Sequence, residues 1–233
     1  MSKRVRCRKA ILLIALKDAV SAGDFAETFR AEARAGGGAG GVAESWSLPV
    51  GEDEIPRIAH QVLMADSPAP FDAVVQLAGS EVDTSVLSER LAAIGEKLAP
   101  WIDPARSAVL VGEEIRITAG DGPILIVMPL RRLPELTHEQ FMAHWFERHA
   151  DLGEAVEGVR YRQNHIDYAA TNALAEQLGF DFEPLDGLTE SYFSSAAEAH
   201  ELMSRDEVAV GAIEDEKRFI DHTRSHFGFY RII

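Results

Sequence analysis

Two histidines, His144 and His149, are the residues best placed to do chemistry. Phe141 and Trp145 lie four residues apart and start the apolar stripe of a helix that we expect over 137–152. His144 directly precedes Trp145 and His149 follows it by four residues, so both imidazoles can approach the crevice between this helix and the sheet beneath it. A neutral imidazole there accepts or donates a proton near pH 7. The spacing therefore favours acid–base catalysis by these two side chains.

A structural interpretation of the same two histidines remains open. A His beside an apolar stripe is often a hydrogen-bonded core residue, and a protonated His near a helix C-terminus is stabilised by the helix dipole. A metal site is disfavoured, because His144 and His149 are about 140° apart around an α-helix, whereas a helical zinc pair has the spacing i, i+4. The chain also has a single cysteine, so no pair of thiolates is available. We expect neither a metal ion nor a cofactor.

Two strands that follow this helix could supply the rest of a pocket. Alternation along 159–168 puts Asn164 and His165 on opposite faces, so only one of them can line a given pocket. Glu190 and Tyr192 share one face of a later strand. Buried polar groups on such strands need partners, so a structural role stays open for each of them. The residues that we expect to bind substrate are Trp145, Phe146, Tyr161, Asn164, His165, Glu190 and Tyr192.

Charge and composition exclude several partners. The 233 residues carry 38 acidic and 23 basic side chains, a formal net charge of −15. Nucleic acids and anionic membranes bind basic surfaces, so we expect neither as a partner. We expect surplus acids such as Glu214, Asp215 and Glu216 on loops and outer helix faces, where they favour solubility. The single cysteine favours a reducing compartment, and we expect a cytoplasmic protein.

The N-terminal segment imitates a secretory signal. Residues 1–9 carry five basic groups and no acid, and the apolar run 10–16 follows them. This run has only seven residues, Lys17 and Asp18 end it, and no small-residue cleavage site follows. No apolar stretch approaches the roughly 20 residues of a membrane span. We therefore expect a basic tail that leads into a strand, and no span.

The two halves of the chain repeat one order of elements. The apolar run 11–16 matches 124–130, and the segment 101–107 (WIDPARS) matches 219–225 (FIDHTRS). Each match is short, but they occur in a common order at a nearly constant offset. The pattern therefore indicates an internal duplication.

Each repeat reads as a βαββαβ unit, at residues 10–118 and 123–233, after the tail at 1–9. This ferredoxin-like order makes a four-stranded antiparallel sheet with both helices on one face. The first strand of each unit is apolar at every position, so both of its faces must be buried. The economical cover for each bare face is the other unit's sheet. We expect an α+β fold of tandem ferredoxin-like repeats, whose two sheets pack within one chain as a dimeric-α/β-barrel-type fold.

The first unit lacks both histidines. When the first helices of the two units are aligned, Thr28 stands at the place of His144 and Ala33 at the place of His149. If the histidines only supported the fold, the first unit would need them too. The asymmetry favours a special role in the second unit, and drift between the copies is the alternative.

Four motifs make the second unit resemble the EthD domain over about residues 123–233. They are LTxExFxxHWxxxHAxL at 136–152, YxQNH at 161–165, DGxxExYF at 186–193 and DExxFIDxxRS at 215–225. EthD proteins are dimeric α/β-barrel proteins, and the first unit resembles a degenerate copy of the same domain. The resemblance implies small-molecule metabolism, namely ether or aromatic-compound catabolism in bacteria and cofactor-free decarboxylation of polyketide-like aromatics in fungal relatives. It also implies roles for the paired histidines and for the strand motif.

Our leading expectation is a cofactor-independent enzyme of the lyase, decarboxylase or isomerase type. His149 would be the general base or acid, and His144 would orient substrate or share the proton. The substrate would be a hydrophobic, aromatic small molecule, and a homodimer of such barrels is compatible with the resemblance. Two other functions stay open: a non-catalytic binding or accessory protein, and a cofactor-free or haem-type monooxygenase.

Overall fold

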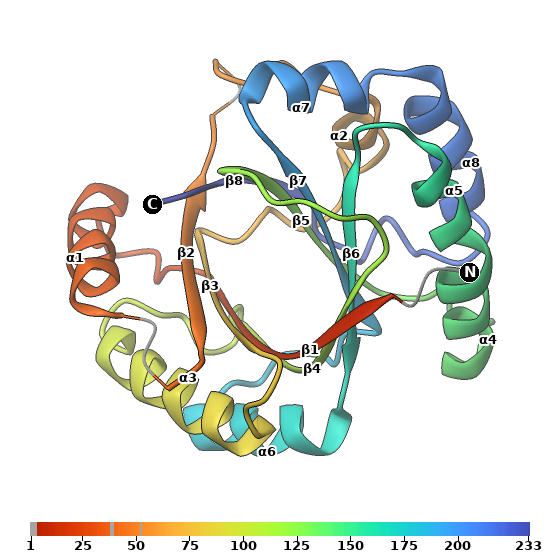
Figure 1. Cartoon of the computed structure of the whole chain (residues 1–233). Helices are drawn as coiled ribbons and strands as arrows, with labels where there is room; N and C mark the ends of the chain where they lie inside the picture. Colours follow the sequence, from red (N-terminus) through yellow and green to blue (C-terminus); the bar gives the residue numbers. More distant parts are fainter. Residues whose placement is uncertain (1–3, 38–39, 52) are drawn as a thin grey trace.

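Eight strands of the described chain close into one antiparallel barrel, seen as a ring in Figure 1. The computed structural model describes residues 4–37, 40–51 and 53–233. The strand order around the barrel is β1-β3-β2-β8-β5-β7-β6-β4. The first half supplies β1 (Val5–Ile14), β2 (Ala43–Pro49), β3 (Ala73–Gly79) and β4 (Ala108–Arg116). The second half supplies β5 (Ile124–Leu130), β6 (Arg160–Ile166), β7 (Gly187–Phe193) and β8 (Gly228–Ile232).

The two halves meet at two antiparallel seams. β2 pairs with β8 and β4 pairs with β6, so the sheet of each half continues into the other. Each half has its four strands side by side, as the ferredoxin-like order requires. The predicted tandem repeat, packed within one chain as a dimeric-α/β-barrel-type fold, is confirmed.

The described helices lie outside the ring of strands (Figure 1). The first half has α1 (Ala22–Ala35), α2 (Ala59–Leu63) and α3 (Thr84–Leu98). The second half has α4 (His138–Met142), η1 (Ala143–His149), α5 (Ala150–Ala155), α6 (Tyr168–Leu178), α7 (Ala196–Met203), η2 (Glu207–Ala212) and α8 (Ile213–Glu216). None of these helices is long and apolar enough to cross a membrane.

Strand β1 shows why the first strand of each unit is apolar throughout. Leu12 and Ile14 belong to the layer between the barrel and helices α1 and α3, whereas Ile11 and Leu13 belong to the layer inside the barrel. Alternate side chains of one strand therefore fill two different cores. A third apolar layer lies between the second half's strands and its helices.

Strand β1 begins at Val5, earlier than the start at residue 10 that the apolar run predicts. Its basic residues face acidic residues of β4: Arg6 Nη1 donates to Glu113 at 2.6 Å, and Cys7 stands opposite Glu114. Cross-strand charge pairs support this part of the strand. Hydropathy alone could not detect it.

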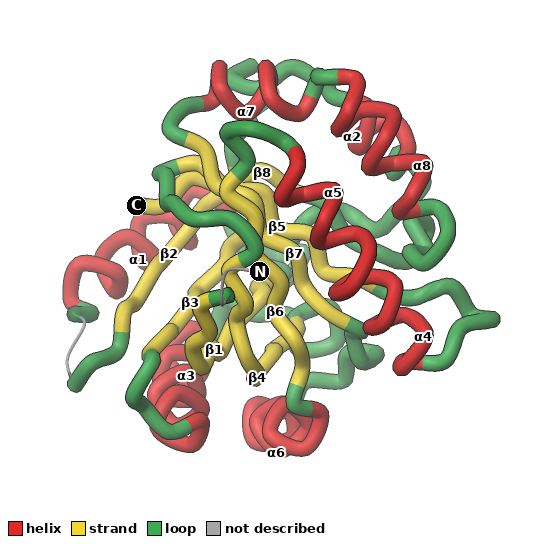
Figure 2. The backbone as a smooth tube through the Cα atoms, turned by 45° about the vertical axis from the view of Figure 1, so that its right-hand side comes forward, coloured by secondary structure: helices red, strands yellow, loops and turns green. Residues whose placement is uncertain are grey.

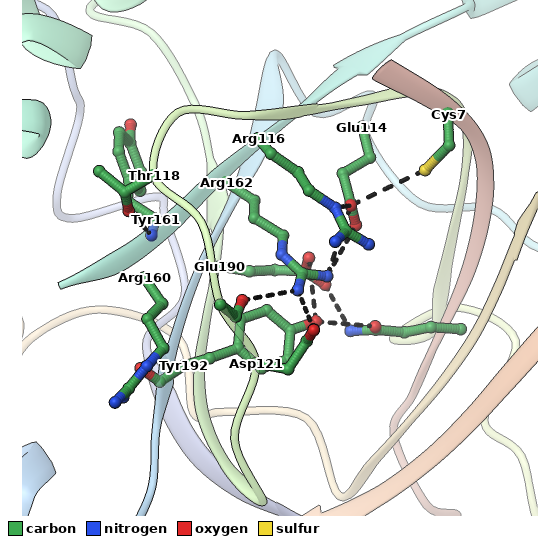
Figure 3. Close-up of polar contacts among 12 residues, drawn as sticks. Cys7, Glu114, Arg116, Thr118, Asp121, Arg160, Tyr161, Arg162, Glu190 and Tyr192 are labelled. Carbon is green, nitrogen blue, oxygen red and sulfur yellow. Dashed lines mark hydrogen bonds and ion pairs between the residues drawn. The ribbon is translucent and has the colours of Figure 1, made fainter. Parts of the chain in front are cut away.

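Charged side chains lie inside the barrel beside its apolar layer, and Figure 3 shows Arg162, Glu114 and Glu190 among them. Lys9 Nζ lies 2.7 Å from Glu114 and 2.5 Å from Glu190. The guanidinium of Arg162 lies 4.1 Å from the centre of the Tyr192 ring and donates to Glu114. Burial would raise the pKa of Glu114, but Lys9 and Arg162 together lower it to about 2. The network ties β1 and β4 of the first half to β6 and β7 of the second.

The halves repeat their hydrogen bonds as well as their order of elements. In the first half, Asp72 Oδ2 accepts from the backbone N–H of Leu16 at 2.7 Å. In the second half, Asp186 Oδ2 accepts from the N–H of Arg132 at 2.9 Å. The isolated β-bridges are also equivalent: Leu16–Ile102 and Arg132–Ile220. The duplication read from the sequence is therefore also visible in the local structure.

Candidate active site

The helix that carries His144 and His149 contains a π-helical segment. Helices α4, η1 and α5 form one continuous rod in Figure 2. It begins with the predicted capping box, in which Thr137 accepts from the N–H of Gln140. Within η1 the backbone bonds run from i to i+5, so residues five apart lie one above the other. The two histidines are therefore on the same side of the helix, and the α-helical estimate of about 140° between them is wrong.

One carboxylate holds both histidines. His144 Nε2 donates to Asp215 Oδ1 at 3.0 Å, and His149 Nδ1 donates to Asp215 Oδ2 at 3.0 Å. The hydrogen bond from His149 lowers the pKa of Asp215 most, and the one from His144 adds to it against the opposing effect of burial. Asp215 therefore stays ionised and fixes His149 with its Nε2 free to act as a base.

The next residue, Glu216, is buried among three histidines. Its Oε1 accepts from His60 Nε2 at 3.3 Å and lies 3.9 Å from His149 Nε2. Its Oε2 accepts from His222 Nε2 at 3.1 Å. Burial alone would raise the pKa of Glu216, but the three imidazoles together lower it well below its usual range. The protein therefore holds an anion next to the basic nitrogen of His149.

His149, His60 and Glu216 lie at the wall of one cavity between the helices and the second sheet. The cavity encloses about 80 Å³ and its mouth is open to solvent. Its other polar groups are Tyr161, Thr189, Ser191 and Glu207, and its apolar walls include Ile126, Met128, Val156, Met203, Val208 and Phe227. A mostly apolar cavity with a few convergent acid–base groups is typical of an active site.

Trp145 and Tyr161 support the cavity from below. Tyr161 lines it, and its hydroxyl oxygen accepts from Trp145 Nε1 at 3.0 Å. Trp145 itself is completely buried and does not line the cavity. Its ring lies so close to Gly187 that a Cβ at that position would come within 2.3 Å of it. Only glycine at this point of β7 lets the helix pack so tightly.

Phe146 and His165 lie together away from the cavity. Their rings are in edge contact at 5.1 Å, and Phe146 is also covered by the guanidinium of Arg4 at 5.1 Å. Burial lowers the pKa of His165 to about 4, so this imidazole is neutral at pH 7. The structure does not bring these two predicted substrate-binding residues to His149.

Asn164, Glu190 and Tyr192 point into the barrel. Asn164 Nδ2 donates to the carbonyl of Leu188 at 3.1 Å, and Tyr192 donates to Glu190 at 3.3 Å. Their strands separate this interior from the cavity, which lies on the outer face. Asn164 and His165 do face opposite ways, as the alternation predicts. His149 and Tyr161 are thus the predicted site residues that line the cavity, with His144 behind them.

Sequence reasoning missed His60, Asp215 and Glu216. The expectation that both acids lie on outer helix faces is wrong, because histidines from three other segments surround them. The EthD-like motif in the late helix was the one available signal for the two acids. His60 comes from α2 in the first half, 156 residues from Glu216, and no local pattern could reveal that contact.

Comparison with known proteins supports the fold and the second-half domain. The EthD domain model matches residues 133–223. The candidate chlorite dismutase TA0507 superposes with a TM-score of 0.53 at 10% identity, over 98% of this chain and 95% of that chain. A mutant chlorite dismutase from Candidatus Nitrospira defluvii with bound cyanide gives 0.51 at 11%, over 97% and 90%. A candidate monooxygenase from Fusobacterium nucleatum gives 0.51 at 10%, over 100% and 94%. No curated protein matches the sequence.

The leading functional expectation, a lyase, decarboxylase or isomerase, is wrong. The proteins that share this fold are described as chlorite dismutases and as a monooxygenase, and these names describe neither a lyase nor an isomerase. The expectation came from the EthD resemblance, and a shared domain determines fold better than it determines the reaction.

Haem does not fit the residues around this cavity. Its two propionates need cationic partners, and the described cavity wall contains no Lys or Arg. The nitrogen that would bind iron, His149 Nε2, faces the ionised Glu216, and its other nitrogen is already bound to Asp215. The acid–base side chains are therefore what the cavity offers a bound molecule. Within a single-chain barrel of the dimeric α/β type, residues 133–223 in the second half of this protein match the EthD domain.

Proposed function

We propose that the cavity is the active site of a monooxygenase-type enzyme in which His149 is the general base. The observation that carries the proposal is the position of His149. Its Nδ1 is fixed by Asp215, and the residue lines a mostly apolar cavity. The shared fold with a candidate monooxygenase supports the choice of reaction class.

The geometry suits the removal of a proton from a weakly acidic molecule. Asp215 stabilises the imidazolium that forms when His149 Nε2 takes a proton, as a carboxylate does for a catalytic His in other enzymes. Apolar walls surround these groups, so the electrostatic interactions among them are stronger than in bulk solvent.

The reaction balances without another reductant. A methylene group next to a carbonyl or between aromatic rings loses a proton to His149 and becomes a carbanion. The carbanion gives its electrons to O₂ and forms a C–O–O⁻ peroxide, which takes up a proton. Removal of the second C–H proton then breaks the O–O bond. The carbon becomes a ketone, and the other oxygen atom leaves as water.

The charge of the cavity favours a neutral substrate. Glu216 and Glu207 line it, and the described wall has no Lys or Arg. An anionic molecule would meet uncompensated negative charge in a medium of low dielectric constant. We therefore propose a neutral, apolar aromatic substrate with one activated methylene or hydroxyl group.

Anthrone is a suitable probe, because its central methylene is oxidised to the ketone of anthraquinone with one O₂ consumed and one water formed. We expect the protein to catalyse this O₂ uptake and His149→Gln to slow it by about 100-fold or more. His200→Gln, on α7 and outside the cavity lining, is the matched control and should keep the wild-type rate. Equal rates in the two variants would overturn the proposal. Equal loss of rate and melting temperature in His149→Gln would indicate a structural histidine.

A further inference from the structure

His60 is a buried histidine that the first half contributes to the cavity of the second half. It lies on α2, which sits beside α8 in Figure 2, and only 3% of it is exposed. Its ring stacks on Phe227 with the centroids 5.6 Å apart. Its Nε2 donates to Glu216, but its Nδ1 is buried and has no hydrogen-bond partner among the described residues. A buried nitrogen left in this state is costly, so its retention at a cavity wall calls for a functional reason.

One carboxylate oxygen links His60 to His149. Glu216 Oε1 lies 3.3 Å from His60 Nε2 and 3.9 Å from His149 Nε2. His222 occupies the other oxygen at 3.1 Å but does not line the cavity. The remaining titratable groups around the cluster are His144, Asp215, Tyr161 and Glu207. His60 and His149 are therefore the two imidazoles that both contact Glu216 and line the cavity.

We propose that His60 is a second proton-transfer residue of the cavity, coupled to His149 through Glu216. The proposal rests on the proposed monooxygenase-type function. That reaction removes two protons from carbon and delivers two protons to oxygen, so a base and an acid are needed on the same substrate. A single imidazole that has taken a proton cannot take the second until the first has left.

The path of each proton is complete. His149 Nε2 takes the first proton from carbon, and the His60 imidazolium, whose Nε2–H is held by Glu216, gives its Nδ1 proton to the peroxide. Neutral His60 Nδ1 then takes the second proton from carbon, and the His149 imidazolium gives its Nε2 proton to the hydroxide that leaves when the O–O bond breaks, so that water forms. The two histidines end the cycle as they began it, and no proton is gained or lost overall.

His60→Gln is the variant that tests this role. The Gln amide keeps a donor for Glu216 but cannot carry a proton, so we expect kcat for anthrone oxidation to fall by about 100-fold with a much smaller change in KM. His222→Gln makes the same substitution on the other oxygen of Glu216, away from the cavity, and should lose far less. His200→Gln should lose nothing. Equal losses in the His60 and His222 variants would overturn the proposal, because His60 would then merely support Glu216.

A second readout needs no turnover. In protein labelled with ¹⁵N-histidine, we expect His60→Gln to move the Nε2 resonance of His149 at pH 7, and His222→Gln to move it less. An unmoved His149 resonance in His60→Gln would overturn the coupling. If the resonance moves but the wild-type protein consumes no O₂ with anthrone, the proposed function fails and the coupling between the two histidines stands.

Discussion

The two halves place different residues at the end of equivalent helices. Leu98 ends α3 in the first half and is completely buried. Glu216 ends α8 at the matching place in the second half and is buried among three histidines. The match follows from Trp101 and Phe219, which stand three residues further on in the repeated segment. An apolar side chain is stable there without partners, whereas a carboxylate needs partners for both oxygens. The second copy therefore required changes in several distant segments at once.

The first helices of the two halves also differ, and again the second half departs from the simpler arrangement. Helix α1 is a regular α-helix, whereas the second half has the π-helical η1 at the corresponding place. The π-helical geometry brings His144 and His149 to one side, where Asp215 binds both. π-Helical segments are rare and are frequent at functional sites. The comparison teaches that one copy keeps the plain scaffold, while the other departs from it where the candidate site is built.

A substitution in the charged network inside the barrel, which joins the two halves, should give the largest change in stability. Lys9→Met leaves Glu114 and Glu190 buried without their shared cation, and we expect it to lower the free energy of unfolding by about 3–5 kcal/mol. Urea denaturation measures this loss. Arg8→Met, whose side chain is 53% exposed, is the control and should cost less than about 1 kcal/mol. Similar costs for both variants would show that the barrel interior does not tie the halves together.

Glu216→Leu gives the second half the residue of the first. We expect anthrone oxidation to fall by about 100-fold, because the anion beside His149 is lost. The pKa of Glu216 is lowered in the folded protein, so its ionisation adds stability above its unfolded pKa of about 4.3. This contribution fades as the pH falls toward the folded-state pKa.

The difference in melting temperature between wild type and Glu216→Leu should therefore depend on pH. The wild type should lose more stability between pH 6 and pH 3 than the variant does, because the variant has no carboxylate to protonate at this position. Glu214→Leu, an exposed residue of the same helix, should follow the wild type. A parallel course for all three proteins would mean that Glu216 is not held as a buried anion.

Trp145→Phe makes the core under the site resemble that of the first half, where Phe29 stands at this place. The variant loses volume and the hydrogen bond to Tyr161, so we expect about 1–3 kcal/mol less stability and a reduced rate, because Tyr161 lines the cavity. Thermal unfolding measures the loss of stability, and O₂ uptake with anthrone measures the rate. Trp101→Phe is the control, because it gives the first half the residue that the second half has at Phe219. It should lower stability less and leave the rate of O₂ uptake unchanged.

Sequence patterns predicted the scaffold well, because each pattern acts within one element. The all-apolar β1 and β5, the capping box at Thr137 and the alternation along β6 are all local signals, and the structure shows each of them. The cavity depends on contacts between elements far apart in the chain. His60 and Glu216 meet only because α2 crosses to the second half.

The π-helix was also beyond prediction from the residues alone. The sequence of η1 has no proline or glycine to mark a departure from α-helix, so an angle of about 100° per residue was the natural assumption. That assumption separated His144 from His149 and hid Asp215 as their common partner. The acids were placed outside because ionised groups are seldom buried, and their burial here depends on histidines contributed by other segments.

The smallest effect is expected from building the histidines into the first half. Thr28→His with Ala33→His should change stability by less than about 0.5 kcal/mol, because these positions are not in the buried core. In the His149→Gln background the pair should restore no O₂ uptake, since α1 is regular and α3 ends in Lys97 and Leu98 where the second half has Asp215 and Glu216. Recovery of activity would show that histidine spacing alone suffices.

The most direct test of the central claim is to observe which histidines respond to a bound molecule. Anthrone added without oxygen to ¹⁵N-histidine-labelled protein should move the resonances of His149 and His60, which line the cavity. His165, packed against Phe146, and His226, whose Nδ1 donates to the carbonyl of Ala69, should stay in place. The opposite result would contradict the proposed site: unchanged resonances for His149 and His60, together with a shifted resonance for His165 or His226, would place the binding site elsewhere on the barrel.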